Sequence, residues 1–588
     1  MPPLMSPFEG TGSQRQPNPT QPHDEQRSLA SRSSQLLFEA PVMLSLSPDQ
    51  SQRILMLEFF KRWYFLCHFV YICVCVSIGA VGLLLLEADI SVVDAVFIAT
   101  SSVCNCGLQT VDVGAWRTST TLFRHLLLLT GGVVVTSSFQ PLLRLFMLHR
   151  MRDVFLPEVE DTPLEAQLRA KKREEAHRLY YTALISAVTP FAYLVVVNGV
   201  IMALLFCFNT SHLSGLQVFC MTLASFHSSI FLPMEAYAND VAVAGLVAVA
   251  CALGFTAFPV VLRGFMWTEW TAVRFVRRVA KPIARCVELC RKRPGRTTEV
   301  DDNGAEGTSE VEDDAMNVGL LRTGQQHHHN SNDTPHAPFL VQLRDVDVAF
   351  QEVLRSTEPG AFHPFLFQPG ETGYLGAAWW ALTLAQAFPY WYEQWDGVLH
   401  PYPWPYKIYI SLCQAAVVRF AAASFLPLLD CSNAHVAVTI LAMFLPALPI
   451  STDRTYRKWK EMFRTSIVRL LTSRLFWIFM AMVLVLFVEE QDMRASIMNT
   501  RFDMLTRTLF EVVSAYAGCG LSLTLAGATV SFVGLTSTFS KLIIAAVILG
   551  GRHRFVDLGI DLGFSTLGSQ VRAVAEPRLP PASPFEAH

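Results

Sequence analysis

The sequence predicts an all-α polytopic membrane protein with eight transmembrane helices, arranged as four span/pore-loop/span repeats around one central pore. Three observations support this prediction. Hydrophobic residues make up 52% of the 588 residues and charged residues only 16%, against roughly 25% charged residues in soluble domains. Apolar runs of membrane length alternate with shorter ones along the chain. One unusual loop pattern also occurs twice, which indicates an internal repeat.

Eight apolar segments are candidates for membrane-spanning helices, because about twenty residues are needed to cross the hydrocarbon core. They fall into four pairs along the chain. The eight candidates are Trp63–Glu87, Leu122–Leu148, Tyr180–Phe208, Val241–Trp267, Gly373–Tyr392, Val436–Ile450, Leu475–Val488 and Val530–Gly550.

Each pair encloses an apolar segment that is too short or too polar to span. A re-entrant loop of this kind can leave backbone carbonyls at membrane depth only where protein or a watery cavity surrounds them. A ring of four such loops around one axis would meet that condition. The four segments are Val92–Gly107, Leu213–Leu232, Ile408–Leu429 and Met504–Leu521.

The fourth of these segments carries the most informative pattern. Phe510–Ser522 reads FEVVSAYAGCGLS and is followed by Lys541–Arg554, KLIIAAVILGGRHR. Small residues and glycine allow a backbone to turn sharply and to offer its carbonyls. The same shape recurs in Phe97–Asp112, FIATSSVCNCGLQTVD, so that Gly107 corresponds to Gly520. The alternative is that both are ordinary turn glycines.

The repeats and the polar segments predict the organisation of the chain. We expect repeat 1 at residues 56–152, repeat 2 at 153–275, repeat 3 at 366–460 and repeat 4 at 461–565. The flanking segments are a disordered cytoplasmic N-terminal tail at 1–55, a largely disordered cytoplasmic linker at 276–365 and a C-terminal tail at 566–588. The linker is either a solvated connection or a segment that binds anionic lipid or a regulator.

Basic residues orient the predicted spans. If the spans alternate, the clusters that flank them fall on one side, and the positive-inside rule makes that side cytoplasmic, together with both termini. We expect a multi-pass protein of the plasma membrane. Acidic residues fall on the outer side, where they would concentrate cations. Asn209 begins an Asn-Thr-Ser acceptor sequence on that side and is a candidate glycosylation site.

These motifs resemble the Trk/Ktr/HKT superfamily of potassium and sodium transporters. The fourth unit, SAYAGCGLS with the helix STFSKLIIAAVILGGRHR, is most similar to the eukaryotic (fungal and plant) branch. The resemblance covers roughly Met56–Gly563 apart from the linker. It implies one ion pathway per chain, a filter in which each loop supplies backbone carbonyls, and a homodimer.

The resemblance also implies which residues form the filter. The first and fourth loops have glycine at the filter position, whereas the second and third loops have isoleucine and phenylalanine. Bulky side chains disfavour a strained filter backbone, so the carbonyl ring would be distorted or poorly selective. Potassium and sodium therefore both stay open as the transported ion. The expected filter residues are Cys106, Gly107, Ser229, Ile230, Ser424, Phe425, Cys519 and Gly520.

Two further features of the predicted pore concern charge and proline. Lys541 lies in an apolar helix, where a charge is usually paired. We expect Asp430 to be its partner in a pore-supporting ion pair, the alternative being a lysine that snorkels to the surface. Pro446 and Pro449 interrupt the sixth span and must break or kink it. The resemblance makes them a candidate gate, with a simple kink as the alternative.

The sequence therefore predicts a monovalent cation transporter with a channel-like pore and a carbonyl selectivity filter, carrying potassium or else sodium. The alternative is a non-conducting or regulatory membrane scaffold descended from one, because Ile230 and Phe425 replace two glycines. We expect monovalent cations and membrane lipids as partners, and neither nucleic acid, cofactor nor metal site. No catalytic triad or phosphate loop supports an enzyme.

Overall fold

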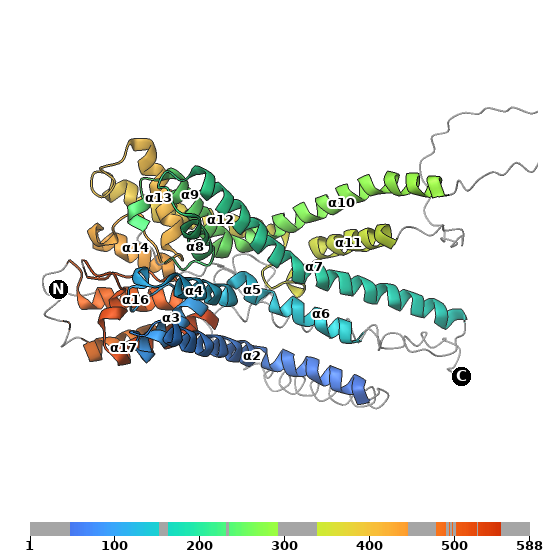
Figure 1. The fold of residues 1–588 in the computed structure, drawn as a ribbon, viewed down its shortest axis with the longest axis horizontal. Helices are drawn as coiled ribbons and strands as arrows, with labels where there is room; N and C mark the ends of the chain where they lie inside the picture. The colour runs from blue at the N-terminus through green and yellow to red at the C-terminus, as the bar shows by residue number, and fades with distance from the viewer. Residues whose placement is uncertain are drawn as a thin grey trace, which may run out of the picture. The chain divides into compact units, whose positions relative to one another are not determined.

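The computed structural model describes residues 48–151, 163–230, 234–291, 338–444, 478–489, 493, 497, 501–525 and 527–553. The chain divides into two units, Met1–Phe59 and Phe60–His588. Within the first unit, residues 48–59 form the beginning of helix α2 (Pro48–Leu86). Within the second, the described residues form helices joined by loops and no strand (Figure 1).

The predicted first repeat contains α2, a short helix α3 (Val92–Val103) and a run of three helices. Ser91 caps α3, because its side chain accepts a hydrogen bond from the Asp94 amide. A Cβ atom at Gly131 would lie 1.5 Å from the Val103 carbonyl oxygen, so this glycine allows the two helices to approach closely. The three helices that follow are α4 (Thr118–Gly131), α5 (Val133–Ser137) and α6 (Phe139–Met151).

The predicted second repeat contains α7 (Pro163–Phe208), the short helix α8 (Gly215–Phe226), and α9 (Val241–Cys251). A π-helical turn, Ala252–Thr256, joins α9 to α10 (Phe258–Arg291), and the chain bends there by 90°. Such turns are a recognised cause of sharp helix bends.

Asp240 stabilises the segments between α7 and α8 and at the start of α9. Its carboxylate accepts hydrogen bonds from the backbone amides of Thr210, Ser211, Ala242 and Val243. Burial by itself would raise the pKa of Asp240, but these hydrogen bonds outweigh it and hold the pKa below its ordinary value. The carboxylate therefore stays ionised and fixes the start of α9.

The second half of the chain begins with α11 and contains two more short helices, α13 and α16. Asp503 caps α16 through the Thr506 amide. The described elements are α11 (Pro338–Arg355), α12 (Pro369–Glu393), α13 (Trp404–Val418), α14 (Asn433–Phe444), the helix Ile478–Glu489, α16 (Met504–Ala517) and α17 (Thr538–Arg552).

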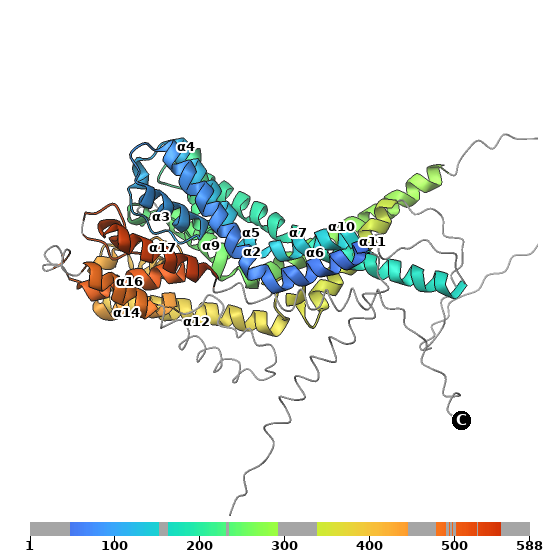
Figure 2. The same cartoon turned by 90° about the horizontal axis from the view of Figure 1, so that it is seen from below.

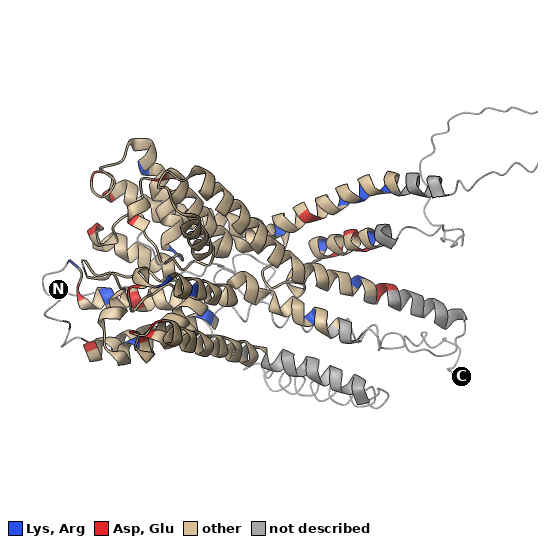
Figure 3. Ribbon diagram, in the orientation of Figure 1, with Lys and Arg blue, Asp and Glu red and all other residues tan. Residues whose placement is uncertain are grey.

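Some of the described helices have the length and surface expected of a helical membrane protein. Leu66–Leu86, Thr118–Ser137 and His177–Phe208 are long and apolar enough to cross a membrane, and α9 with α10 form a fourth candidate if the bent pair is one span. Long stretches of helix carry no charged residue (Figure 3). Large apolar side chains on them, such as Leu85 and Val195, are exposed.

Several predicted boundaries differ from the structure, and two of them concern the eighth span and the linker. α17 begins at Thr538, later than the predicted start of the eighth span at Val530, because a 3-10 turn, Phe532–Leu535, comes first. Helices occupy both described ends of the predicted linker, since α10 continues to Arg291 and α11 begins at Pro338. The amphipathic α11 packs against α7 and α10.

The segments predicted as four repeats contact one another in cyclic order. His125 on α4 contacts the Cys220 carbonyl on α8 at 3.1 Å, and Tyr409 on α13 donates to the Val241 carbonyl on α9. α14 lies beside α16, and α17 lies beside α3 (Figures 1 and 2). A common apolar core buries the inner faces of the short helices. These contacts direct the loops that follow the short helices toward one another.

Candidate functional site

The loops that follow the four short helices meet at one place. A Cβ atom built on Gly107 would lie 2.1 Å from Ala422 Cβ and 3.5 Å from Ser229 Cα. One built on Gly520 would lie 2.0 Å from the Cys106 carbonyl oxygen and 2.7 Å from Gly107 Cα. These short distances join the first, second, third and fourth loops, so Gly107, Ser229, Ala422 and Gly520 surround a common centre.

The backbone at this centre adopts a conformation that favours glycine. Gly107 has φ 100° and Gly520 has φ 79°. Ala422 also has a positive φ, 55°, at a cost of about 1–2 kcal/mol for a residue with a Cβ atom. The third loop therefore carries strain that the two glycines avoid.

Three of the loops leave their helices through the same turn. Each has a residue with positive φ, namely Asn105, Ser228 or Gly518. The amide of the next residue then donates to a carbonyl in the last turns of the helix: Cys106 to Ser101, Ser229 to Ala224 and Cys519 to Ser514, at 2.8–2.9 Å. The third loop has a different hydrogen-bond pattern: the backbone amides of Phe420 and Ala421 both donate to the Val417 carbonyl.

This difference corrects the predicted register of the third loop. Ala422, three residues before Phe425, is the residue that contacts Gly107 and Gly520. Phe425 is buried in the apolar core, and its amide donates to Gln414 Oε1 at 2.7 Å. Ser424 is likewise engaged by Gln414 Nε2. The assignment of Ser424 and Phe425 to the centre was therefore wrong for this structure, which places Ala422 there.

The second loop bonds directly to the third. The Ile230 amide donates to the Ala421 carbonyl at 3.1 Å, and the Ile230 side chain is 1% exposed. The Ser229 hydroxyl is buried without a hydrogen-bond partner among the described residues. The predicted residues Ser229 and Ile230 thus lie where the second and third loops meet. The Ala421 carbonyl of the third loop already accepts a hydrogen bond from the protein.

The cysteines of the first and fourth loops direct their side chains outward. The Cys106 thiol lies 3.9 Å from the Ala515 carbonyl on α16, and the Cys519 thiol donates to the Val418 carbonyl on α13 at 2.9 Å. Both are fully buried. The Cys106 side chain thus links the first loop to α16, and the Cys519 side chain links the fourth loop to α13. Neither thiol is directed toward the centre.

Buried polar side chains on the short helices hold the loops in place, and sequence reasoning missed them. The Gly107 amide donates to Ser101 Oγ at 3.0 Å, and Gln414 accepts from the third loop. Glu511 on α16 accepts from Ser522 Oγ at 2.7 Å and from the Val533 amide at 3.0 Å. A polar residue on the buried face of an apolar helix is the only signal that could have indicated them.

Arg507 fixes the return segment of the fourth loop. Its guanidinium is 2% exposed and donates to the carbonyls of Phe502, Leu523 and Thr524. These acceptors lie on both sides of the loop that contains Gly520. One side chain therefore closes the loop onto α16.

Replacing Arg507 by glutamine should destabilise this loop, because buried carbonyls left without donors cost about 1–3 kcal/mol. We expect a lower temperature of thermal unfolding for the detergent-solubilised chain. Arg501→Gln is the matched control, since Arg501 is exposed and donates to a single carbonyl, that of Asp430. Equal unfolding temperatures for the two variants would contradict the role of Arg507.

A small cavity of about 30 Å³ lies next to the C-terminal ends of α3, α8 and α16. It is lined by the first residues after α3, α8 and α16, including Asn105, His227 and Ser228. Asn105 Oδ1, His227 Nε2 and Ser228 Oγ have no hydrogen-bond partner among the described residues. Helix C-termini favour cations, and this volume is comparable to that of one water molecule.

Arg552, in the last turn of α17, lines the same cavity. Its guanidinium donates to the Gly131 carbonyl and, at 3.1 Å, to Thr136 Oγ1. The basic end of this helix is thus part of the cavity wall. Its positive charge opposes the attraction of a cation by the helix ends.

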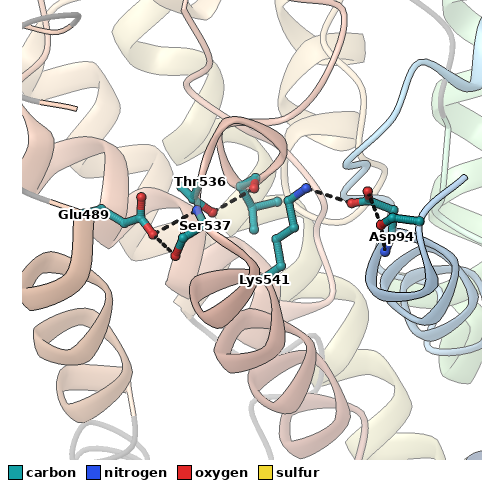
Figure 4. Close-up of polar contacts among 7 residues, drawn as sticks. Asp94, Glu489, Thr536, Ser537 and Lys541 are labelled. Atoms are coloured by element: carbon teal, nitrogen blue, oxygen red, sulfur yellow. Dashed lines mark hydrogen bonds and ion pairs between the residues drawn. The ribbon is translucent and has the colours of Figure 1, made fainter. Parts of the chain in front are cut away.

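Lys541 on α17 forms an ion pair with Asp94 on α3, with Nζ and Oδ1 2.8 Å apart (Figure 4). Both side chains are 14% exposed. Burial alone would raise the pKa of Asp94, but hydrogen bonds from Lys541 and Ser91 outweigh it and lower the pKa. The pair joins α17 to α3.

The predicted partner of Lys541, Asp430, was therefore wrong. Asp430 is exposed in a 3-10 turn, Leu428–Asp430, and its carbonyl accepts from Arg501 at 2.7 Å. The acid that reaches Lys541 is the first-turn residue of α3. On the other side of α17, Glu489 accepts from the Ser537 amide and hydroxyl and fixes the start of the helix (Figure 4).

The remaining predicted residues are two prolines and a candidate glycosylation site. Pro446 and Pro449 lie outside the described residues. Asn209 directly follows α7. Its side-chain Nδ2 donates to the Leu205 carbonyl, and its Oδ1 accepts from the Leu213 backbone amide. Glycosylation of Asn209 stays a prediction. Among the described residues, no group of three His, Cys, Asp or Glu side chains could hold a metal ion.

The fold and this centre define a helical membrane protein in which the loops that follow four short helices meet. The family model for TrkH, described as a cation transport protein, matches residues 400–563, which include α13, α14, α16 and α17. This match and the similar fungal proteins are consistent with the resemblance to the Trk/Ktr/HKT superfamily and its fungal branch.

Two of the similar fungal proteins are potassium transporters by name. The chain is 33% identical over 102 residues to Potassium transport protein 1 of Schizosaccharomyces pombe, covering 17% of this chain and 12% of that protein. It is 39% identical over 74 residues to Potassium transporter TRK1 of Candida albicans, covering 13% of this chain and 6% of that protein. The matched segments are thus a small part of these relatives.

Proposed function

We propose that this protein transports monovalent cations, potassium first, through a channel-like pore at the junction of its four loops. Backbone carbonyls next to Gly107, Ser229, Ala422 and Gly520 would replace part of the hydration shell of the ion. The observation that carries the proposal is the convergence of these four residues, within a few ångströms, from four separate repeats. The names of the fungal relatives favour potassium, and sodium is the alternative ion.

The same proposal includes eight spans in four repeats around one pore, with both termini cytoplasmic at the plasma membrane. The cyclic contacts between α4 and α8, α9 and α13, α14 and α16, and α17 and α3 support this arrangement. Inward cation movement would be driven by the membrane potential, which supplies about 2.3 kcal/mol per charge per 100 mV. No bound nucleotide is needed for such a pathway.

Growth and rubidium uptake in a cell that lacks its own potassium uptake systems would test this function. Expression of the chain should restore growth at low potassium concentration, and Gly520→Arg, which places a long cationic side chain at the centre, should abolish the rescue at equal surface expression. Failure of the surface-localised wild-type chain to rescue growth, with both potassium and sodium uptake measured, would contradict the proposal.

The Ala422 methyl group should restrict this pathway. Its Cβ atom occupies the space beside Gly107 and Gly520, where the first and fourth loops have no side chain. We expect Ala422→Gly to raise rubidium uptake severalfold, because it removes the methyl group and relieves the positive-φ strain. Phe425→Gly, at the position that sequence reasoning chose, is the control and should reduce protein stability instead. Equal uptake by wild type and Ala422→Gly would contradict the restriction.

A second candidate function is that of a non-conducting membrane scaffold. The specific observation in its favour is the hydrogen bond from the Ile230 amide to the Ala421 carbonyl, which occupies a potential ion ligand. Under this alternative, the wild-type chain shows no flux, whereas Ala422→Gly combined with Ile230→Gly gains flux from zero. Transport by the wild-type chain would exclude it.

A further inference from the structure

A groove of about 490 Å³ lies between α10, α11 and the start of α12, apart from the loop junction. Arg263, Trp267 and Trp270 line it from one face of α10, Gln351 and Arg355 from α11, and Thr372 from the first turn of α12. Its wall thus combines two guanidinium groups, two indole rings and two short polar side chains. The groove is large enough for a polar group of several heavy atoms.

The charge of the groove is positive and uncompensated. The residues that line it include no acid. Arg263 donates to two neutral groups, the carbonyls of Phe367 and Leu354, so its charge is oriented but not neutralised. Arg355 is exposed and has no hydrogen-bond or ion-pair partner among the described residues. Arg274 adds a third cation near the rim, 4.9 Å from the Trp270 ring.

Three acids on α11 and α12 make contacts with residues that do not line this groove, or with Trp270 of its wall. Asp347 accepts from Trp270 Nε1 at 2.7 Å and pairs with Arg277 at 2.5 Å. Glu352 pairs with Arg178 at 2.7 Å, and Glu371 accepts from the Gln368 amide. Asp347 and Glu352 are thus paired with other arginines, and neither forms an ion pair with Arg263 or Arg355.

The surroundings of the groove are those of a membrane boundary. Trp267 is 55% exposed, and farther along α10 an apolar row of Phe275, Val279 and Ile283 is exposed at helical spacing. Basic residues, Arg274, Arg278 and Lys281, lie between them. Exposed tryptophan marks the interface, and a helix with an apolar row and a basic face suits an anionic lipid surface.

We propose that this groove binds the head group of an anionic phospholipid of the cytoplasmic leaflet. The phosphate would contact Arg263 and Arg355, with Gln351 and Thr372 as hydrogen-bond donors to the head group. The acyl chains would lie against Trp267 and the apolar row of α10. The basic residues place this end of α10 on the cytoplasmic side by the positive-inside rule, where basic pockets between helices select anionic head groups. This binding is independent of ion conduction.

Thermal unfolding of the purified full-length chain in detergent, titrated with short-chain phosphatidylserine, tests this site. We expect phosphatidylserine to raise the unfolding temperature, and phosphatidylcholine and inorganic phosphate to have no effect. Arg355→Gln should require roughly fivefold more phosphatidylserine for the same shift. Arg344→Gln is the matched control, because Arg344 is an exposed arginine of α11 outside the groove, and it should respond like the wild type.

Three results would overturn the proposal. An unchanged response of Arg355→Gln would show that the groove is not the site. Equal stabilisation by phosphatidylcholine would show that head-group charge is not recognised, and equal stabilisation by inorganic phosphate would identify an anion site in place of a lipid site. Trp267→Ala provides a second reading, since it should weaken the effect of phosphatidylserine without removing a positive charge.

Discussion

Replacing Gly520 by alanine is expected to abolish cation uptake. The added Cβ atom would lie 2.0 Å from the Cys106 carbonyl oxygen, 2.6 Å from Ala422 Cβ and 2.7 Å from Gly107 Cα. Two of these atoms belong to backbone that cannot move without displacing the first loop. The positive φ of 79° adds about 1–2 kcal/mol of strain. We expect at least a hundredfold loss of rubidium uptake at equal surface expression.

Gly527→Ala separates the two causes of this loss. Gly527 has nearly the same φ, 82°, but a Cβ atom there would meet nothing within 4 Å. This control therefore has the backbone strain without the collision. We expect it to retain most of the uptake. A similar loss in both variants would mean that strain in the segment, and not contact between the loops, accounts for the effect of Gly520→Ala.

Removing either member of the Lys541–Asp94 pair should be strongly destabilising. The two charges are largely buried, so a single replacement leaves the other charge without its partner, at a cost of about 3 kcal/mol or more. In a double-mutant cycle with alanine, we expect Lys541→Ala and Asp94→Ala to be non-additive, because the second replacement removes a charge that is already unpaired. The measurement is the free energy or temperature of unfolding in detergent.

Asp430→Ala is the control for this cycle. Asp430 is the acid that sequence reasoning paired with Lys541, but it is exposed and lies elsewhere in the structure. Its replacement should cost little and should be additive with Lys541→Ala. Coupling of Lys541 to Asp430 and additivity with Asp94 would contradict the structural assignment.

Local features of the sequence were sufficient to locate the short helices and two of the four loops at the centre. α3, α8 and α16 lie within the segments predicted to be re-entrant, because their apolar length and the turn residues that end them are local properties. Gly107 and Gly520 could be found because a positive φ at a close approach requires glycine.

The third loop shows where this reasoning fails. Its turn differs from those of the other loops, so a register transferred from them is displaced by three residues, from Ala422 to Phe425. Alanine gives no sign in the sequence that it occupies a strained position. The partner of Lys541 could not be predicted from local sequence either. Several acids fall on the same predicted side of the membrane as Lys541, and only the packing of α17 against α3 selects Asp94.

The most direct test of the central claim is potential-driven rubidium uptake into lipid vesicles that contain only the purified chain. The proposed pore predicts uptake that increases with an inside-negative potential, disappears with Gly520→Arg and rises with Ala422→Gly. If correctly folded wild-type protein carries neither rubidium nor sodium, and Ala422→Gly with Ile230→Gly gains flux from zero, the four-loop junction is closed in the natural chain and the transport function is contradicted.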